Sequence, residues 1–420
     1  MGKVDCLMIG TGEYTTGYSP SAVAKSDKSA GVVGVTMFDM RRRGKVDRLG
    51  LCGVNGKKLP EIRAHLDKAI AKTYKDMDCA VECFPGDDQV DAAAYIKALD
   101  SFKPGDAVTV FTPDDTHFTI TKAAVERGLH VLTTKPLVKT LAEHVELMEL
   151  ALKHNVLIMC EVHKRFDPIY TDARDRIARM GSFSFIDSYM SQPKTQLHTF
   201  KSWAGKSSDI SYYLNSHHID FHEWCVDGKS RPIRVTASAA TGVAKKFVNA
   251  QDCEDTITLV VQWENMIDGS LGTAVYTSSW IAPKAEVHSQ QRFFYMGHDG
   301  EVRVDQAHRG YEVATDENGY ASCNPLFMKY TPNPRGEFAG QLGYGYRSIE
   351  AFIDAVDAIQ TGEKTVIEFN ETLPTIHTTL LTTAILEAGR ISLDSKCMPV
   401  SLDYDGESCH PKGLTVLGGN

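Results

Sequence analysis

Short apolar runs and amphipathic stretches alternate through the first 165 residues. Apolar runs with the length of buried strands stand at 4–9, 49–54, 107–111, 129–132 and 156–160. Between them, the recurrence of apolar residues every three to four positions predicts helices over 30–43, 60–75, 91–99, 118–127 and 141–154. Strands that alternate with helices of this length favour βαβ units and a parallel sheet.

The pattern changes after Asp167-Pro168. Helices are predicted over 169–180, 348–361 and 374–393. Extended segments lie between the first and second of these, at 183–191, 232–239, 255–264, 270–280, 291–296 and 301–305. Strands that follow a run of βα units predict a second, α+β domain on a mostly antiparallel sheet. We therefore expect one domain at 1–165 and another at 166–420.

Composition narrows the functional classes. The 420 residues carry a net charge of −9 without clustered Lys and Arg, which argues against nucleic-acid binding. No apolar run approaches the ~20 residues of a membrane span, and the N-terminus lacks the regions of a signal peptide. The ten cysteines form no CxxC pair, so we expect free thiols in a reducing compartment, the cytoplasm.

A glycine turn follows the first strand. Gly10 and Gly12 stand where a dinucleotide-binding fold lets backbone N–H groups approach a pyrophosphate. The next glycine comes five residues later, so the loop over 13–29 is longer than in the G-x-G-x2-G pattern. We expect Gly31 or Gly34 to provide the close helix–strand packing that the third glycine normally allows. The alternative is an ordinary structural turn.

The second predicted strand ends without an acidic residue. A carboxylate at this place binds the adenosine 2′-hydroxyl of NAD in many dinucleotide-binding domains. This chain has Val54-Asn55-Gly56-Lys57-Lys58 instead, so nothing repels a 2′-phosphate and two lysines attract it. The segment slightly favours NADP over NAD. The alternative is that the lysines form a solvated helix start, since most lysines are exposed.

Four motifs follow one another along the chain. They are Thr112-Pro113-Asp114-Asp115-Thr116-His117, Thr134-Lys135-Pro136, His163-Lys164-Arg165-Phe166-Asp167-Pro168 and Asn215-Ser216-His217-His218-Ile219-Asp220. In this order they resemble the glucose–fructose oxidoreductase, inositol dehydrogenase and MocA (Gfo/Idh/MocA) family. They are similar to its TPxxxH turn, its EKP motif with Thr134 in place of the glutamate, its RF.P domain junction and its DxGxHxID-like segment.

The resemblance implies an α/β Rossmann domain followed by an α+β domain with a large, mostly antiparallel open sheet. The second domain would bind substrate and form a homodimer or homotetramer, and the C-terminal helix stays in it or packs back on the first domain. Family activities are mostly oxidations or reductions of sugars, polyols and their derivatives. We therefore expect an NAD(P)-dependent oxidoreductase that acts on a hydroxyl or carbonyl of a sugar, sugar derivative or cyclitol.

Oxidation of a secondary alcohol needs a base for the hydroxyl proton and a donor or cation that stabilises the developing alkoxide. The resemblance assigns these roles to Lys135, at the carboxyl end of a predicted strand, and to His217. Tyr213 stands where the family often has an aspartate, four residues before His217. On a helix both would share a face. Either is the base, or the two act as a relay.

The other candidate residues come from the same segments. Expected cofactor contacts are Gly10, Gly12, Glu13, Tyr14, Asn55, Lys57, Lys58, Thr112, Pro113, Asp114, His117, Thr134 and Lys135. Expected substrate contacts are Lys135, Lys164, Arg165, Trp203, Tyr213, His217 and His218.

Several of these residues have a second interpretation. Trp203 either stacks on a sugar ring or packs in the protein, and Lys164 and Arg165 reach the ligands or form structural ion pairs. His218 and His222 have the i,i+4 spacing of zinc ligands, but no third ligand is indicated, so we expect no metal. They are then buried helix residues, oriented by the acidic side chains of Asp220 and Glu223.

Two other functions stay open. Some relatives in the family use a tightly held nicotinamide for redox-neutral cleavage of glycosides, and the long loop after Gly12 suits such retention. A non-catalytic cofactor-binding sensor is the other alternative.

Overall fold

The computed structural model describes residues 3–19, 30–248, 253–285, 287, 289–317 and 319–418. Most of the expected long loop, residues 20–29, lies outside the described residues. The chain divides by packing into two units. The first comprises Met1–Leu137, Val145–Asp167 and Pro325–His377, and the second comprises Val138–His144, Pro168–Asn324 and Thr378–Asn420.

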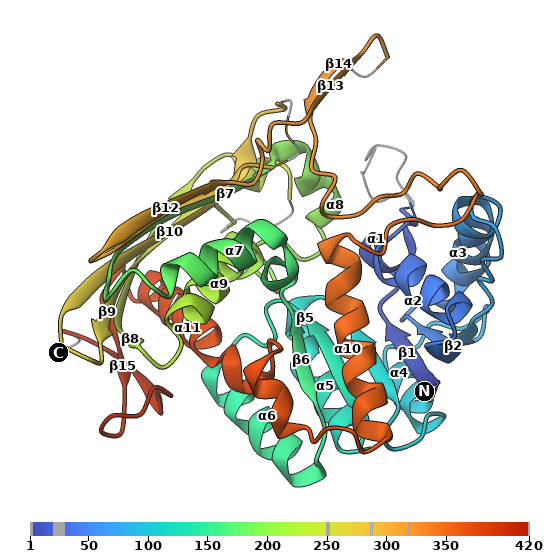
Figure 1. The fold of residues 1–420 in the computed structure, drawn as a ribbon, viewed down its shortest axis with the longest axis horizontal. Helices are drawn as coiled ribbons and strands as arrows, with labels where there is room; N and C mark the ends of the chain where they lie inside the picture. The colour runs from blue at the N-terminus through green and yellow to red at the C-terminus, as the bar shows by residue number, and fades with distance from the viewer. Residues whose placement is uncertain are drawn as a thin grey trace. The chain divides into compact units, whose positions relative to one another are not determined.

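The first unit is built on a six-stranded parallel sheet of order β3-β2-β1-β4-β5-β6 (Figure 1). Its strands are β1 (Val4–Ile9), β2 (Val46–Cys52), β3 (Glu82–Phe84), β4 (Ala107–Val110), β5 (His130–Thr134) and β6 (Ile158–Glu161). The helices of the unit are α1 (Glu13–Thr16), α2 (Val33–Arg42), α3 (Leu59–Leu66), α4 (Ala94–Asp100), α5 (His117–Val125), most of α6 (Leu141–His154) and α10 (Tyr344–Gln360). The predicted Rossmann fold is confirmed, and its strand order reverses between β1 and β4, where such sheets bind ligands.

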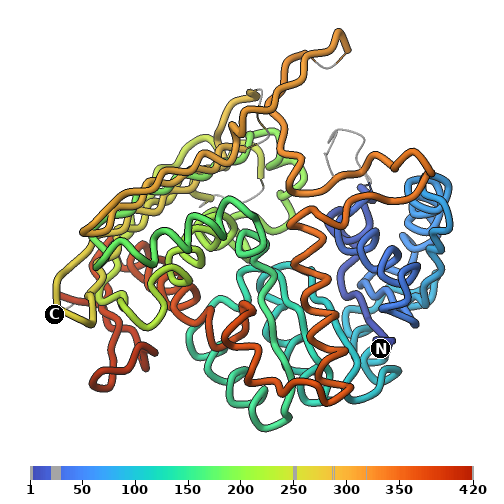
Figure 2. Tube along the Cα trace, viewed as in Figure 1, coloured from blue at the N-terminus to red at the C-terminus, as the bar shows by residue number. Residues whose placement is uncertain are grey.

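Residues 325–377 return to the first unit late in the chain. Figure 2 shows the start of this segment, in orange, beside the blue helices of the same unit. The Tyr330 hydroxyl donates to the Gly31 carbonyl at 2.9 Å, and the Tyr74 hydroxyl donates to the Tyr330 carbonyl at 2.7 Å. The domain extents expected from the sequence, 1–165 and 166–420, do not include this return.

Helix α10 is held to helix α2 by a buried carboxylate. Asp39 is fully buried, and its Oδ2 accepts a hydrogen bond from the Tyr346 hydroxyl at 2.8 Å. Its Oδ1 accepts from Nη2 of Arg42 at 2.6 Å. Burial raises the pKa of Tyr346 further above its ordinary value, so the phenol keeps the proton that it donates. A buried charge is tolerated because it is paired and hydrogen-bonded in this way.

The second unit is built on an eight-stranded sheet of order β12-β11-β7-β10-β9-β8-β15-β16. The strands are β7 (Phe183–Pro193), β8 (Ser230–Thr241), β9 (Glu254–Asn265), β10 (Leu271–Ala282), β11 (Gln291–Gly297), β12 (Gly300–Asp305), β15 (Val400–Asp403) and β16 (Gly413–Val416). Only β7 and β10 pair in parallel. The predicted large and mostly antiparallel sheet is confirmed, and β13 (Glu312–Thr315) and β14 (Gly319–Ser322) form a separate hairpin.

One face of this sheet is covered by helices α7 (Pro168–Ile177), α9 (Ser216–Val226) and α11 (Leu380–Asp394), as Figure 1 shows. Residues that point to them, such as Val261 and Tyr276, are fully buried. On the other face, Val260, Leu271 and Met296 are exposed. The closing helix α11 therefore belongs to the second unit, and its predicted start at 374 is six residues early.

Two general expectations can be compared with the described residues. No helix among them is long and apolar enough to cross a membrane. All ten cysteines lie in the described ranges, and each has a free thiol.

Tyr346→Phe removes the hydroxyl that donates to buried Asp39. We expect the free energy of unfolding to fall by about 1–3 kcal/mol, the usual cost of leaving a buried acceptor short of a donor. Chemical denaturation followed by circular dichroism measures this. The matched control is Tyr311→Phe in an exposed position, which should change the free energy by less than ~0.5 kcal/mol. Equal effects of the two substitutions would contradict the assigned role of Tyr346.

Candidate functional site

The glycine turn after β1 is shaped by a close backbone contact. Gly10 has φ +115°, and a Cβ added to it would lie 2.0 Å from the carbonyl oxygen of Phe111, which follows β4. Gly12 precedes helix α1, and a Cβ there would meet no described heavy atom within 4 Å. The first glycine thus lets the turn lie against the neighbouring strand end, and the second keeps its outer side open for a ligand.

The first residues of the predicted loop 13–29 form the short helix α1, and the helix predicted over 30–43 is α2. A Cβ added to Gly31 or to Gly34 would lie 2.7 Å from the carbonyl oxygen of Thr15. These glycines therefore pack the start of α2 against α1, which corrects the expected packing of helix on strand. Tyr14, at the second position of α1, stacks its ring on Phe111 with the centroids 5.5 Å apart.

At the end of β2 there is no space for a carboxylate at the residue that follows the strand. A Cβ added to Gly53 would lie 2.7 Å from the side chain of Thr11. Asn55 uses its side-chain oxygen to accept from the backbone N–H of Lys57 at 3.1 Å. The Lys57 and Lys58 side chains are exposed. This strand end therefore presents two cations and a side-chain amide.

The turns after β4 and β5 are joined by His117. Its ring is fully buried, with Nδ1 2.8 Å from the Pro136 carbonyl oxygen and Nε2 2.9 Å from the Thr112 carbonyl oxygen. Both ring nitrogens thus lie on backbone groups, one in each turn. Lys135, before Pro136, is half-buried, and the peptide bond between them is cis. His117 therefore fixes the backbone that carries Lys135 to the turn that begins with Thr112.

The end of β6 carries an acidic residue that the sequence analysis did not single out. Glu161 is buried and pairs in register with Thr134 on β5. Its Oε1 accepts from the Ser348 hydroxyl at 2.9 Å and lies 3.4 Å from Nδ1 of His163. The EKP motif that the chain resembles has a glutamate at the position of Thr134. In this chain the carboxylate is supplied by Glu161, on the neighbouring strand. An acidic residue that ends an apolar strand was the signal for it.

The residues after β6 are largely enclosed. Lys164 and Arg165 are 1% and 8% exposed, in the short turn His163–Phe166. The ring of His163 stacks on Tyr344 with centroids 5.4 Å apart. Charged side chains are rarely buried to this extent without a specific role in pairing or binding.

In the second unit, Tyr213 and His217 lie on consecutive helical segments. Tyr213 belongs to the π-helical turn η6 (Ser211–Asn215), and His217 belongs to the first turn of α9. Asp209 accepts from the backbone N–H of Tyr212 at 2.9 Å and so caps the segment. Burial raises the pKa of Asp209 to about 6. Short π-helical turns are frequent at functional sites, where they change the direction of side chains.

The two neighbouring histidines are packing residues. Nε2 of His218 lies 3.0 Å from the Tyr170 hydroxyl, and Nδ1 of His222 lies 2.6 Å from the Tyr276 hydroxyl. Both rings are buried, and burial lowers the pKa of His222 to about 3. The predicted substrate contact of His218 is therefore corrected, because its ring is enclosed among Tyr170, Phe293 and helix α9.

Glu223, one of the two acidic residues expected to orient these histidines, binds the start of a helix in the same unit. Glu223 accepts from the backbone N–H groups of Leu381 and Thr382 at 2.9 and 2.8 Å, at the start of α11. A carboxylate at this place stabilises the helix N-terminus. Within the described ranges, no group of three His, Cys, Asp or Glu side chains is arranged to hold a metal ion.

Trp203 lies in an aromatic cluster with Phe200, Tyr213 and Trp280. Its ring centroid is 4.9 Å from Phe200, 5.4 Å from Tyr213 and 5.7 Å from Trp280. The cluster connects the loop before η6 with strand β10. Packing and ligand stacking are both compatible with a half-buried tryptophan in this position.

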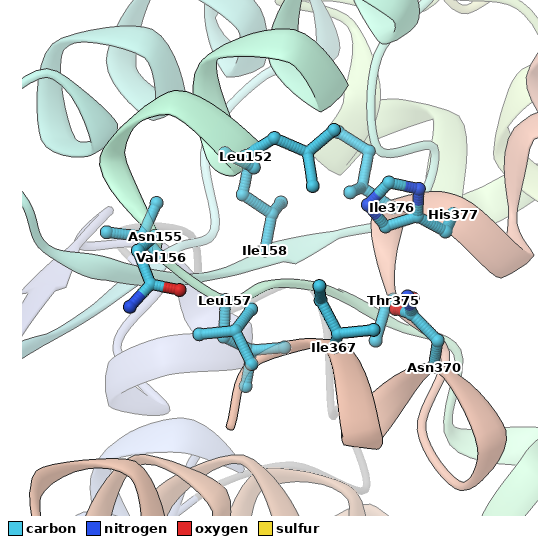
Figure 3. Close-up of a pocket in the computed structure, with 12 residues that line it drawn as sticks. Leu152, Asn155, Val156, Leu157, Ile158, Ile367, Asn370, Thr375, Ile376 and His377 are labelled. Carbon is cyan, nitrogen blue, oxygen red and sulfur yellow. The ribbon is translucent and has the colours of Figure 1, made fainter.

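The first unit has a groove between residues 151–158 and residues 366–377. Figure 3 shows Leu152, Val156, Ile158 and Ile367 among its lining side chains, with His377 at its rim. Val156 and Ile158 stand at the amino end of β6. Ligands of open parallel sheets bind at the carboxyl ends, so the groove is not part of the predicted cofactor edge.

Known proteins support this description of the first unit. Residues 4–162 match the model of an oxidoreductase family with an NAD-binding Rossmann fold. The chain is 30% identical over 118 residues to the uncharacterized oxidoreductase YdgJ of Escherichia coli. The aligned residues cover 27% of this chain and 34% of that protein. It is 24% identical over 289 residues to the inositol 2-dehydrogenase of Rhizobium meliloti. The aligned residues cover 66% of this chain and 79% of that protein. The chain thus spans about a third of the length of the first of these relatives.

Solved structures share the whole fold. GenD2 from gentamicin A biosynthesis, in complex with NAD, superposes with a TM-score of 0.66 at 17% identity, over 96% of this chain and 97% of that one. The scyllo-inositol dehydrogenase of Lactobacillus casei, with bound NAD(H) and scyllo-inositol, gives 0.64 at 16% identity, over 95% and 99%. The matched family model, the inositol dehydrogenase relatives and the two-unit fold agree with the motifs along the chain. Residues 4–162 thus match the Gfo/Idh/MocA oxidoreductase family model, and the chain as a whole has the fold of inositol dehydrogenases.

Proposed function

We propose that this protein is an NAD(P)-dependent oxidoreductase that transfers a hydride between a nicotinamide dinucleotide and a hydroxyl or carbonyl of a sugar, sugar derivative or cyclitol. The observation that carries the proposal is the position of Lys135 in the first unit. It follows β5 at the carboxyl edge of the parallel sheet, on a turn that His117 fixes to the turn after β4. The inositol dehydrogenases among the relatives support the substrate class.

The residues at the sheet edge fit a dinucleotide. Gly12 leaves open space beside the turn, and Gly10 brings that turn against β4. We propose contacts from the glycine turn, with Glu13 and Tyr14, to the pyrophosphate side of the ligand. Thr112, Pro113, Asp114 and Thr134 would line the nicotinamide side, and His117 would act through the backbone that it holds. When bound, the nicotinamide supplies the hydride acceptor or donor.

The protein's own part in the reaction is proton transfer and charge stabilisation. The Lys135 ammonium would hydrogen-bond the reacting oxygen and stabilise the alkoxide that develops during oxidation. The His217 imidazole would accept the hydroxyl proton, because histidine is the side chain that most often serves as a general base near neutral pH. Tyr213, four residues earlier, would orient the same hydroxyl or pass the proton on. In the reduction direction the same groups return the proton to the carbonyl oxygen. Lys164 and Arg165 are proposed to hold the ligands from the turn after β6.

Lys135→Ala should lower kcat by about 100-fold or more, the usual contribution of a proton-transfer or alkoxide-stabilising group. The dissociation constant of the dinucleotide, measured by protein fluorescence quenching, should change much less. The matched control is Lys153→Ala on the exposed side of α6, which should keep the parent kcat. Parental turnover in the Lys135 variant would overturn the proposed role.

We propose a preference for NADP over NAD, because Gly53 excludes an acid at the end of β2 and two exposed lysines follow. The double substitution Lys57→Ala, Lys58→Ala should weaken NADP binding about tenfold or more and leave NAD binding within about twofold, since only the 2′-phosphate gains from these charges. Titration calorimetry measures both constants. The control is Lys68→Ala, Lys72→Ala, beyond α3. Equal losses for NAD and NADP would contradict the assignment.

We propose self-association as a homodimer or homotetramer through the open face of the second sheet. Val260, Leu271 and Met296 are exposed on it, and exposed apolar faces mark interaction surfaces. Sedimentation velocity should give a dimer or tetramer, and Val260→Glu should shift it to the monomer mass. The exposed Leu152→Glu in the first unit is the control. A monomeric parent protein at micromolar concentration would refute this surface.

A further inference from the structure

Four aromatic side chains form a continuous wall in the second unit. The wall consists of Phe200 at the end of α8 (Leu197–Phe200), Trp203 in the following loop, Tyr213 on η6 and Trp280 on β10. The ring centroids of Trp280 lie 5.7 Å from Phe200, 5.7 Å from Trp203 and 5.4 Å from Tyr213. Segments that are distant in sequence thus bring four aromatic rings to one place.

Trp280 is the backing of the wall. It is 1% exposed, whereas the other three rings are half-buried. Strand β10 has a bulge here, because Ser279 pairs with Ser191 and Ala282 pairs with Pro193. Trp280 and Ile281 therefore stand opposite the single residue Gln192. Bulges redirect side chains and are frequent beside binding sites.

The ring orientations leave the indole of Trp203 without a parallel neighbour. Tyr213 is stacked on Trp280 at an interplanar angle of 19°. Trp203 meets Phe200, Tyr213 and Trp280 at 43°, 56° and 62°. Among the described residues, no aromatic ring stacks on either face of this indole. A half-exposed ring without such a neighbour is suited to stacking on the apolar face of another ring.

The wall begins beside the proposed acid/base. Tyr213 stands four residues before His217, on the preceding helical segment. The ring centroid of Trp203 lies 5.4 Å from that of Tyr213. The wall therefore continues past Tyr213 by one more aromatic ring, that of Trp203. A bare cyclitol or monosaccharide, with one ring, would leave its far part unused.

We propose that the aromatic wall is a substrate subsite in which Trp203 stacks on a second ring of the substrate. The preferred substrate is then a glycoside or another ring-substituted sugar or cyclitol, rather than a bare one. This specificity rests on the proposed oxidoreductase function. Trp203 is a specificity-determining residue, Tyr213 joins its subsite to the reacting group, and Trp280 supports both rings.

The first test compares paired substrates that differ only in a second ring, glucose with phenyl β-glucoside and with cellobiose, and myo-inositol with an inositol glucoside. Trp203→Ala should lower the ratio of kcat/KM for the two-ring member to that for the one-ring member by tenfold or more. Trp203→Phe should recover most of the ratio, because it restores a ring. The control Trp224→Phe, outside the wall, should leave the ratio unchanged. A ratio that Trp203→Ala does not change would overturn the proposal.

The second test measures binding without catalysis. In the Lys135→Ala protein, titration with phenyl β-glucoside should give a saturable change of tryptophan fluorescence that the added Trp203→Ala substitution removes. Thermal unfolding verifies that each variant is folded. Saturable binding that depends on Trp203, together with a parent protein that oxidises none of these substrates, would support the wall and refute the proposed function. If oxidation depends on Lys135 but glycoside binding is unchanged by Trp203→Ala, the wall is refuted and the proposed function is not.

Discussion

The close contact between Gly10 and the carbonyl group of Phe111 is the constraint on which the cofactor edge depends. A side chain at residue 10 would have to occupy space 2.0 Å from that oxygen, so the turn after β1 and the turn after β4 can lie together only with glycine there. The stacking of Tyr14 on Phe111 and the packing of α2 on α1 follow from the same arrangement. These contacts lie at the switch point of the sheet, where folds of this kind bind their ligands.

A second set of contacts fixes the backbone that carries the proposed reacting groups. His117 holds the backbone of the Thr112 and Pro136 turns, and Asp209 caps the segment that bears Tyr213. Neither side chain needs to touch a ligand. Each holds the backbone of neighbouring residues in place, and in enzymes correct positioning of the reacting groups lowers the barrier to reaction. By contrast, His218 and His222 are close to His217 in sequence but serve packing, because their rings face tyrosines in the interior.

The sequence predicts most of the fold because strand and helix patterns are local. The period over 141–154 coincides with α6, and the apolar run 4–9 coincides with β1. What it does not predict depends on residues far apart in the chain. Nothing near Glu223 indicates that its carboxylate caps α11, and nothing near Tyr346 indicates a bond to Asp39. The motifs indicated Lys135 and His217. Glu161 ends an apolar strand, but its place beside Thr134 depends on the pairing of β5 with β6. Gly31 and Gly34 do allow a close backbone approach, as expected, but to helix α1 rather than to a strand.

The central claim is that Lys135 and His217 act on one oxygen of the substrate. A crystal structure of the ternary complex with a dinucleotide and an unreactive substrate analogue tests it most directly. The account predicts Nζ of Lys135 and a ring nitrogen of His217 both within about 3.2 Å of the same hydroxyl oxygen, with its carbon facing the nicotinamide. A complex in which the two side chains contact different parts of the ligand, or in which either points away from it, would contradict the account.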